Sequence, residues 1–294
     1  MKPNFLIVGA PKCGTTALWR YLNDHPDVFM SPRKDMHFFG SDLDFTKRSR
    51  FSQQEYEHFF VDAHQKAIGE ASVWYLYSQK AAQEIAAYQP DMKIIIMVRD
   101  PIQIMYAHYT QLKLNGLGDE DIPTFAQALA AQEDRKKGLR IPRHNTLPSA
   151  LLYTEVARLS VQIQRYMDHF PKENILVLFQ EDMKKDMHKM YIHTLEFLGV
   201  DPQFSTEFTR INSHKEVRSE GFRRLIGAIP QPLKNYIPQD FRERFRKLVR
   251  KYNTRHAKRP PLDPQLERAL RKDFDEEIRL LSALIERNID HWRM

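Results

Sequence analysis

The feature that most constrains this chain is a short apolar run that ends in a glycine turn and continues as a helix. The run FLIVGA occupies residues 5–10, and its uninterrupted apolar character is typical of a strand buried on both faces of a parallel sheet. Gly9 and Gly14 mark the turn, and residues 15–23 place apolar side chains at helical spacing. A strand, a glycine turn and a helix form the first half of a β–α–β unit, which predicts an α/β fold.

Apolar segments and helical patterns alternate along the rest of the chain. Further strands are predicted at 66–72, as an edge strand or strand end, at 93–101, as a central strand, and at 174–182. Helices are predicted at 79–88, 102–114, 124–132, 151–170 and 187–198, and 264–292 is either one long amphipathic helix or two shorter ones. We therefore expect a P-loop-like three-layer α/β/α fold with a central parallel sheet and a helical C-terminal part, forming one domain over residues 1–294. Ligands of such folds bind at the carboxyl ends of the strands.

Charge is distributed unevenly along the chain. There are 45 Lys and Arg residues against 38 Asp and Glu, and residues 210–259 alone hold fifteen against four. Within this basic helical segment (210–260), residues 241–259 place an apolar stripe among arginines and lysines, which suits peripheral contact with a membrane or a polyanion. The commoner arrangement packs such a stripe onto the domain and leaves the charges solvated. No nucleic-acid-binding module is recognisable, so nucleic acid is not an expected partner.

Cysteine content and hydropathy indicate the compartment. Cys13 is the one cysteine, so an intrachain disulfide is impossible and nothing requires an oxidising environment. No apolar run approaches the roughly 18 residues of a membrane span. The N-terminal residues lead directly into the apolar run at Phe5 and lack the small-residue cleavage site of a signal peptide. We therefore expect a soluble, cytoplasmic protein, whose oligomeric state the sequence does not determine.

The turn after the first strand has the spacing of a phosphate-binding loop but a different placement of its lysine. Gly9 and Gly14 match Gly-x-x-x-x-Gly, yet Thr15 stands where the P-loop lysine belongs and Lys12 lies inside the turn. An ammonium group there lies closer to a 5′-phosphate than to a third phosphate. This favours a nucleotide with a short 5′ diester or mixed anhydride, bound without a metal ion. Two other interpretations are an ordinary turn with an exposed lysine and a P-loop-like nucleotide kinase or hydrolase.

Five segments, in order along the chain, resemble the sulfotransferases that use 3′-phosphoadenosine 5′-phosphosulfate (PAPS), in particular the branch that acts on heparan-type glycans. They are PKCGTT (11–16), HPDVFMSPRKDMHFFG (25–40), GEASVWYL (69–76), VRDPIQIMYAHY (98–109), and VLFQEDM with FLGV (177–183 and 197–200). The ending, 270–292, is similar to the tail of that family. The resemblance implies transfer of the sulfuryl group from PAPS to a hydroxyl or amine of a saccharide, lipid or small-molecule alcohol. The spent donor is 3′-phosphoadenosine 5′-phosphate (PAP).

The resemblance also implies which residues bind the donor. Lys12 would neutralise the leaving 5′-phosphate. Arg99 would bind the 3′-phosphate with help from a late pair, Arg218 and Ser219. The alternative for Arg99 is an ion pair with its neighbour Asp100. The loop residues implied to surround the 5′-phosphate are Pro11, Lys12, Cys13, Gly14, Thr15 and Thr16.

Three residues are candidates for the base that deprotonates the acceptor. The catalytic glutamate of the glycan branch corresponds to Asp35, a carboxylate one methylene shorter. His37 is the second candidate, since histidine ordinarily titrates near neutral pH. Glu70, at the end of the following predicted strand, is the third. The alternative is structural: Lys34 and Asp35 would form a solvated pair, and His37 would pack beside its aromatic neighbours.

Three positions depart from the family pattern. Ala71 stands where the family often has lysine, and Ala107 replaces a serine near the 3′-phosphate. Gln180 replaces a tyrosine that stacks on adenine in cytosolic members. These departures leave open a catalytically silent protein that uses the same fold to bind an anionic nucleotide or a glycan.

Overall fold

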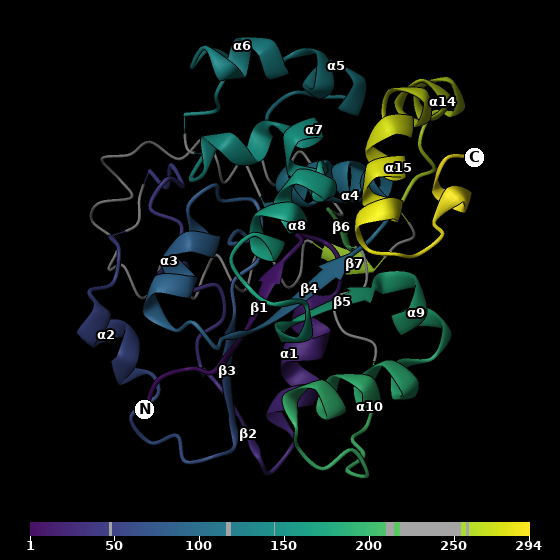
Figure 1. Cartoon of the computed structure of the whole chain (residues 1–294). Coiled ribbons are helices and arrows are strands. Elements are labelled where there is room, and N and C mark those ends of the chain that lie inside the picture. Colours follow the sequence, from purple (N-terminus) through teal and green to yellow (C-terminus); the bar gives the residue numbers. More distant parts are fainter. Residues whose placement is uncertain (47–48, 116–118, 144, 210–214, 218–253, 257–258) are drawn as a thin grey trace.

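The computed structural model describes residues 1–46, 49–115, 119–143, 145–209, 215–217, 254–256 and 259–294. At its centre is a five-stranded sheet in which every neighbouring pair of strands is parallel (Figure 1). In sheet order the strands are β2 (Val28–Met30), β3 (Ala67–Ala71), β1 (Phe5–Gly9), β4 (Lys93–Val98) and β5 (Ile175–Phe179). The predicted α/β fold with a central parallel sheet is therefore confirmed, and the loops that follow the strands share one edge of the sheet.

The strand predicted at 66–72 is interior, so the expectation of an edge strand is wrong. Strand β3 pairs with β2 on one side and β1 on the other, and all five of its residues are buried. Two residues made the segment look like an edge. Gly69 lies against the ring of Phe5, which would be 2.5 Å from a Cβ atom at this position, and Glu70 is buried in hydrogen bonds. The edge is formed by β2, which the sequence analysis does not predict.

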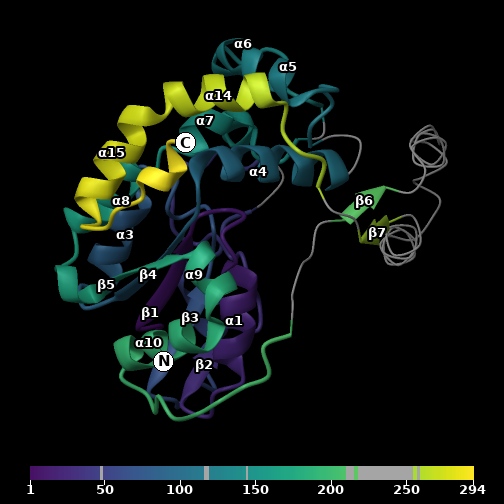
Figure 2. The same cartoon turned by 90° about the vertical axis from the view of Figure 1, so that its right-hand side faces the viewer.

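Helices cover both faces of the sheet, which confirms the three layers. Figure 2 shows α1 (Thr15–Asn23) on one face and α3 (Ala81–Tyr88) with α8 (Leu159–Met167) on the other. After β5, α10 (Met187–Leu198) ends at Gly199, whose φ of 75° is the left-handed conformation common after a helix C-terminus.

Two predicted helices are interrupted. The pattern at 124–132 becomes α5 (Phe125–Ala130) and α6 (Gln132–Lys136). The pattern at 151–170 becomes α7 (Tyr153–Val156) and α8, because Arg158 before α8 has a ψ of 78° that no helix allows. The remaining elements are α2 (Gln53–His58), α4 (Pro101–Asn115), η1 (Pro148–Leu151), η2 (Lys172–Asn174) and α9 (Gln180–Lys185).

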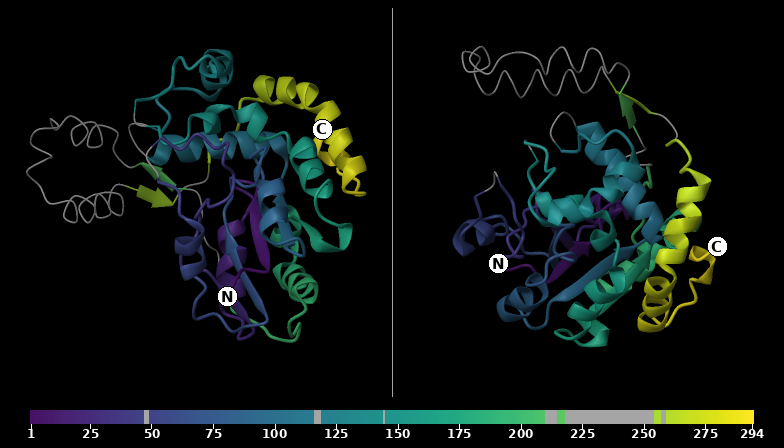
Figure 3. Two further views of the ribbon diagram at one scale, coloured as in Figure 1. Left: turned by 60° about the vertical axis from the view of Figure 1, so that its left-hand side comes forward. Right: turned by 90° about the horizontal axis from the view of Figure 1, so that it is seen from above.

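The C-terminal pattern forms two helices, α14 (Pro264–Asp273) and α15 (Asp275–Leu284), followed by a single turn, η3 (Asp290–Trp292). The Asp263 side chain starts α14 by accepting hydrogen bonds from two N–H groups of its first turn, at 3.0 and 2.9 Å. Figures 2 and 3 show the two helices extending across α4 and α8. This end of the chain therefore packs over the helices that follow β4.

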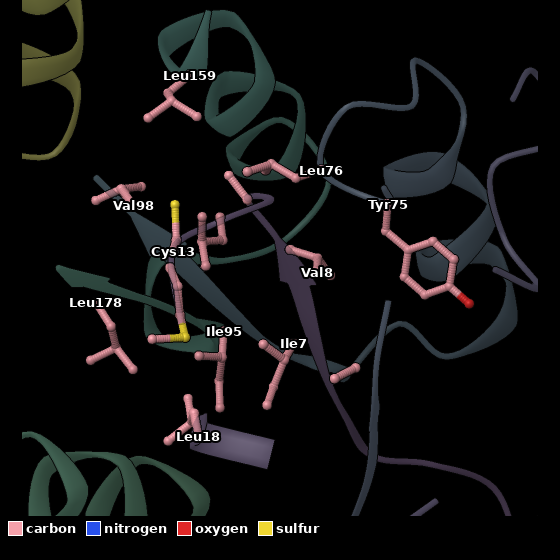
Figure 4. Packing of buried hydrophobic residues seen from close by; sticks show 14 of the residues in the cluster. Ile7, Val8, Cys13, Leu18, Tyr75, Leu76, Ile95, Val98, Leu159 and Leu178 are labelled. Atoms are coloured by element: carbon pink, nitrogen blue, oxygen red, sulfur yellow. The ribbon is translucent and has the colours of Figure 1, made fainter. Parts of the chain in front are cut away.

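The core fixes the strands from which the loops emerge. Ile7 of β1 and Ile95 of β4 are fully buried, and Leu18 of α1 and Leu159 of α8 approach them from opposite sides (Figure 4). Burying one such side chain stabilises the fold by about 1.5–3 kcal/mol. Cys13, in the turn after β1, belongs to the same cluster. The turn is thus anchored in the core on one side.

Some predictions fall outside the described residues. The structure does not describe Arg218, Ser219 or most of the predicted helix at 241–259. Part of the proposed single domain also lies outside the described residues, so these stay predictions. Two short strands, β6 (Lys215–Val217) and β7 (Thr254–His256), form an antiparallel pair at the ends of this region. Within the described part of the chain, no helix combines the length and apolar character that crossing a bilayer requires.

Candidate active site

The turn after β1 is built on glycines where a side chain would not fit. Gly14 has a φ of 102°, and a Cβ atom there would lie 2.9 Å from Sδ of Met183. Gly9 has a φ of 150°, and its Cβ atom would meet the carbonyl oxygen of Val73 at 2.7 Å. Helix α1 begins directly after Gly14, so its first N–H groups and the positive end of its dipole point into the turn. The turn is therefore suited to an anion.

Lys12 lies in this turn and is held by three side chains, two that follow neighbouring strands directly and one from α4. Its φ of 66° is left-handed, a conformation that persists in non-glycine residues only where the surroundings enforce it. Its carbonyl oxygen accepts hydrogen bonds from Nη1 of Arg99 at 3.3 Å and from Nε2 of Gln180 at 3.2 Å. Its ammonium group donates to Oε1 of Gln111 at 3.0 Å. Residues that follow β4 and β5 thus fix the backbone, and α4 fixes the charged end.

Two arginines share the surroundings of Lys12. Burial, followed by the charges of Arg259 and Arg99, lowers the pKa of Lys12 from 10.5 to about 8. Burial lowers the pKa of Arg99, and burial together with the Arg99 charge lowers the pKa of Arg259. Both guanidinium groups remain protonated at neutral pH because their ordinary pKa lies far above it. Three mutually repelling cations in a partly buried place are relieved by binding an anion.

Neutral groups surround the two arginines. Nη2 of Arg99 donates to Oε1 of Gln103 at 3.3 Å. Nε of Arg259 donates to Oγ1 of Thr110 at 3.1 Å, and its guanidinium lies 5.7 Å from the ring centre of Tyr106. Among the residues that the structure describes, neither arginine is ion-paired with a carboxylate. Their charge is therefore available to an anionic ligand.

Asp100, the alternative partner of Arg99, is engaged elsewhere. Its Oδ2 pairs with Nη2 of Arg271 in α14 at 3.2 Å. Its Oδ1 accepts from the Ile102 N–H at 2.9 Å and so caps the start of α4. The alternative interpretation, an ion pair between Arg99 and Asp100, is therefore wrong. The Arg99 guanidinium is directed to the turn instead.

The sequence analysis did not single out Arg259 or Gln111 as site residues. Arg259 belongs to the basic segment, where no local pattern distinguishes it from its neighbours. Gln111 is 99 residues from Lys12 along the chain. One signal points to Gln111: positions 103, 107 and 111 recur at helical spacing on α4, the helix that begins two residues after the predicted phosphate-binding arginine. Ala107, the departure from the family serine, is fully buried on the same helix.

A second loop at this edge follows β2 and carries Asp35. The Asp35 side chain is 43% exposed, and its Oδ1 accepts from Nζ of Lys34 at 2.9 Å. The Lys34 side chain is only 15% exposed, so the pair is half-buried rather than fully solvated. The Val73 N–H donates to Asp35 Oδ1 at 3.4 Å, and the carbonyl oxygen of Val73 lies against Gly9 of the turn, so this pair is near the cationic turn. The structure therefore brings the first candidate base and the candidate phosphate-binding lysine to one place.

The other two candidate bases lie deeper. The His37 side chain is largely buried, and its ring stacks on Phe45 with centroids 4.9 Å apart. Glu70 is fully buried, and its two carboxylate oxygens accept hydrogen bonds of 2.6 and 2.8 Å from hydroxyl groups. Burial raises the pKa of Glu70 to about 7. Of the three candidates, Asp35 is the one whose side chain reaches solvent.

The loop residues implied to bind phosphate differ in where their side chains lie. The Cys13 thiol points into the core and burial raises its pKa to about 12 (Figure 4). It donates to the carbonyl oxygen of Pro11 at 3.5 Å. Thr15 is buried and Thr16 is half-buried at the start of α1. A contact from Cys13 to an anion would therefore use its backbone N–H.

A family model described as sulfotransferase domain matches residues 2–281. Carbohydrate sulfotransferase 15 of Mus musculus is 28% identical over 251 residues, covering 68% of this chain and 44% of that protein. Bifunctional heparan sulfate N-deacetylase/N-sulfotransferase 3 of Homo sapiens is 24% identical over 248 residues, covering 81% of this chain and 27% of that protein. The chain thus spans less than half the length of these curated relatives.

A solved structure agrees over the whole chain. The crystal structure of a sulfotransferase from Alicyclobacillus acidocaldarius superposes with a TM-score of 0.75 at 26% identity and covers 100% of both chains. The resemblance stated from the sequence is confirmed by the family match, which takes in the glycine turn, the Asp35 loop and Arg99. The chain belongs to the sulfotransferase domain family.

Proposed function

We propose that this chain transfers the sulfuryl group of PAPS to a hydroxyl or amine group of a saccharide-type acceptor. The observation that carries the proposal is the convergence of Lys12, Arg99 and Arg259 on a glycine turn at a helix N-terminus, with Asp35 at the same sheet edge. Membership of the sulfotransferase domain family supports the reaction type. Similarity to carbohydrate and heparan sulfate sulfotransferases supports a saccharide over a lipid or a small-molecule alcohol.

The cationic turn fits the charges of the donor. PAPS supplies the sulfuryl group and has anionic 5′ and 3′ ends. Lys12, the turn N–H groups and the hydroxyls of Thr15 and Thr16 would bind the 5′-phosphate, where negative charge grows as the bond to sulfur breaks. Arg99 and Arg259 would hold the 3′-phosphate, and Arg259, which is hydrogen-bonded to Thr110 of α4, would compensate for the serine missing at Ala107. Binding the dianion would restore the pKa of Lys12 toward its ordinary value.

Asp35 is the residue proposed to accept the acceptor proton. The acceptor oxygen forms its bond to sulfur while the bond from sulfur to the 5′-phosphate oxygen breaks. The acceptor proton passes to the Asp35 carboxylate, and the leaving electron pair stays on the phosphate oxygen beside Lys12. Lys34, paired with Asp35 at 2.9 Å, holds the carboxylate at this place in the loop. His37 is the second choice, since its ring is largely buried.

The test measures sulfate transfer from radiolabelled PAPS to a panel of desulfated glycans, a long-chain alcohol and a phenol. Lys12→Ala is expected to lower the rate with the best acceptor by roughly 100-fold or more, because a preorganised charge at the leaving group is lost. The control is Lys137→Ala, which removes an exposed lysine remote from the turn and should leave the rate unchanged. A normal rate in Lys12→Ala, with folding confirmed by circular dichroism, would refute the proposed mechanism.

The sulfate-transfer assay, together with an ATPase assay and calorimetry with PAP, separates the competing interpretations. A kinase or hydrolase would consume ATP in the presence of Mg²⁺ and ignore PAPS, although Thr15 at the P-loop lysine position and the family match argue against it. A catalytically silent member would bind PAP in calorimetry yet transfer no sulfate to any acceptor. Transfer to the alcohol or phenol instead of the glycans would correct the acceptor class and leave the reaction type in place.

A further inference from the structure

The buried carboxylate of Glu70 is the centre of a hydrogen-bonded cluster beneath the Asp35 loop. Its Oε1 accepts from the Tyr75 hydroxyl at 2.6 Å and, more weakly, from the Tyr56 hydroxyl at 3.4 Å. Its Oε2 accepts from the Ser72 hydroxyl at 2.8 Å. All four side chains are buried. A carboxylate placed so deeply is costly unless it has a structural or functional use.

Two of these hydroxyls extend the cluster to the backbone of the Asp35 loop. The Phe38 N–H donates to the Tyr75 hydroxyl oxygen at 2.8 Å, and the His37 N–H donates to the Ser72 hydroxyl oxygen at 3.1 Å. Because each hydroxyl hydrogen is directed to Glu70, each hydroxyl oxygen presents its lone pairs to the loop. Two parallel chains of hydrogen bonds therefore lead from one carboxylate to two consecutive N–H groups.

The loop that these chains hold has an unfavourable backbone. Asp35 and His37 have φ of 58° and 50°, left-handed values that side-chain-bearing residues rarely adopt. Met36 between them is buried, whereas the Asp35 side chain is partly exposed. Left-handed residues on either side of a buried one persist only when neighbouring contacts enforce them. The hydrogen bonds to 37 and 38, with the Asp35 N–H donating to the Ala71 carbonyl at 2.8 Å, are contacts of this kind.

We propose that Glu70 is a positioning residue: through Ser72 and Tyr75 its carboxylate fixes the backbone at 37 and 38 and thereby aims Asp35 at the acceptor. This rests on the proposed function, in which Asp35 takes the proton. In this proposal Glu70 is not the base that takes the acceptor proton, because its carboxylate is enclosed and reaches the loop only through other groups.

A carboxylate suits this role better than an amide. An amide at this position would offer one accepting oxygen and one donating NH₂ group. The hydroxyl facing the NH₂ group would then meet two donors, the amide and the loop N–H, and its own hydrogen would lack an acceptor. Glu70→Gln should therefore release one of the two chains while conserving side-chain size.

The experiment compares two tyrosine variants that each remove one buried hydroxyl from Glu70. Tyr75→Phe removes the hydroxyl that also receives the Phe38 N–H, and it is expected to lower kcat about 10- to 100-fold, the effect of misplacing a catalytic group by about 1 Å. Tyr56→Phe is the matched control, because its hydroxyl touches Glu70 and no N–H of the loop. The KM for PAPS and the affinity for PAP should stay within about twofold in both, since the donor-binding residues lie on other loops.

A second measurement reads the loop without activity. Hydrogen exchange of the peptide covering 37 and 38 should accelerate in Tyr75→Phe and Glu70→Gln and remain unchanged in Tyr56→Phe. Equal effects of the two tyrosine variants, or undisturbed exchange and kcat in Tyr75→Phe, would overturn the positioning role. Loss of kcat in Glu70→Gln without any change in exchange would identify Glu70 as a base instead. Absence of sulfate transfer by the wild-type protein would refute the proposed function alone, because the exchange comparison would still stand.

Discussion

The lowered pKa of Lys12 makes donor binding depend on pH. Its ammonium group titrates at about 8 in the free protein because of burial and the neighbouring arginines. A bound dianion favours the protonated form, so the complex retains the proton to a higher pH than the free protein. The PAP dissociation constant is therefore expected to rise as pH increases through about 8, by at most tenfold per pH unit. Calorimetric titrations between pH 7 and 9 would measure this.

The matched variant for this measurement is Lys12→Met, which keeps an unbranched side chain, one atom shorter, without the titrating group. It should bind PAP more weakly at pH 7 and show a flatter dependence on pH over the same interval. A step near pH 8 of undiminished size in Lys12→Met would assign the titration to another group.

At the scale of single residues, chemistry was predictable and burial was not. The loop spacing and the order of motifs led to Lys12, Asp35 and Arg99, because each lies in a local pattern with a recognisable chemical role. Glu70 was found in the same way, but its role depends on hydroxyl groups that surround it only after β2 and β3 pair. Arg259 was one arginine among many until its packing on α4 set it apart.

At the scale of elements, α4 depends on Asp100 twice. Asp100 caps the helix through the Ile102 N–H and pairs with Arg271 of α14. Asp100→Ala should lower the free energy of unfolding by about 1 kcal/mol for the lost cap, with a further loss from Arg271 left half-buried without this partner. Asp100→Asn keeps a capping oxygen and removes the charge, so it should lose less. Urea denaturation of both variants would show whether the cap or the ion pair contributes more, and a larger loss in Asp100→Asn would contradict this assignment.

Elements with a long regular pattern were predicted more accurately than short ones. Helix α10 begins and ends as its pattern indicated, and the strands at β1, β4 and β5 are present. The missed strand β2 has three residues, too few for a hydrophobic period to show. Helix breaks such as the one at Arg158 are set by tertiary packing, because nothing in the local composition forbids a helix there. The order of strands in the sheet was likewise beyond the sequence pattern.

At the scale of the whole molecule, the site joins parts of the chain that are far apart in sequence. The glycine turn follows the first strand. The side chains that donate to the Lys12 carbonyl oxygen, Arg99 and Gln180, follow β4 and β5. Arg259 comes from the segment that precedes α14. Packing of α14 and α15 across α4 and α8 brings that segment to the turn (Figure 2). The C-terminal helices therefore contribute to the site by placing Arg259 beside Lys12 and Arg99.

Replacing Arg259 tests this long-range assembly through two linked effects. Arg259→Ala should weaken PAP binding at neutral pH by about 10- to 100-fold, the loss of one charge-assisted contact of 1.5–3 kcal/mol. It should also raise the pH at which PAP affinity begins to fall, because the Arg259 charge is the largest effect after burial that lowers the pKa of Lys12. Arg268→Ala, which removes an exposed arginine of α14, should do neither. Weaker binding with an unshifted pH dependence would mean that Arg259 contacts the nucleotide without affecting Lys12. Unchanged affinity would remove the C-terminal segment from the donor site.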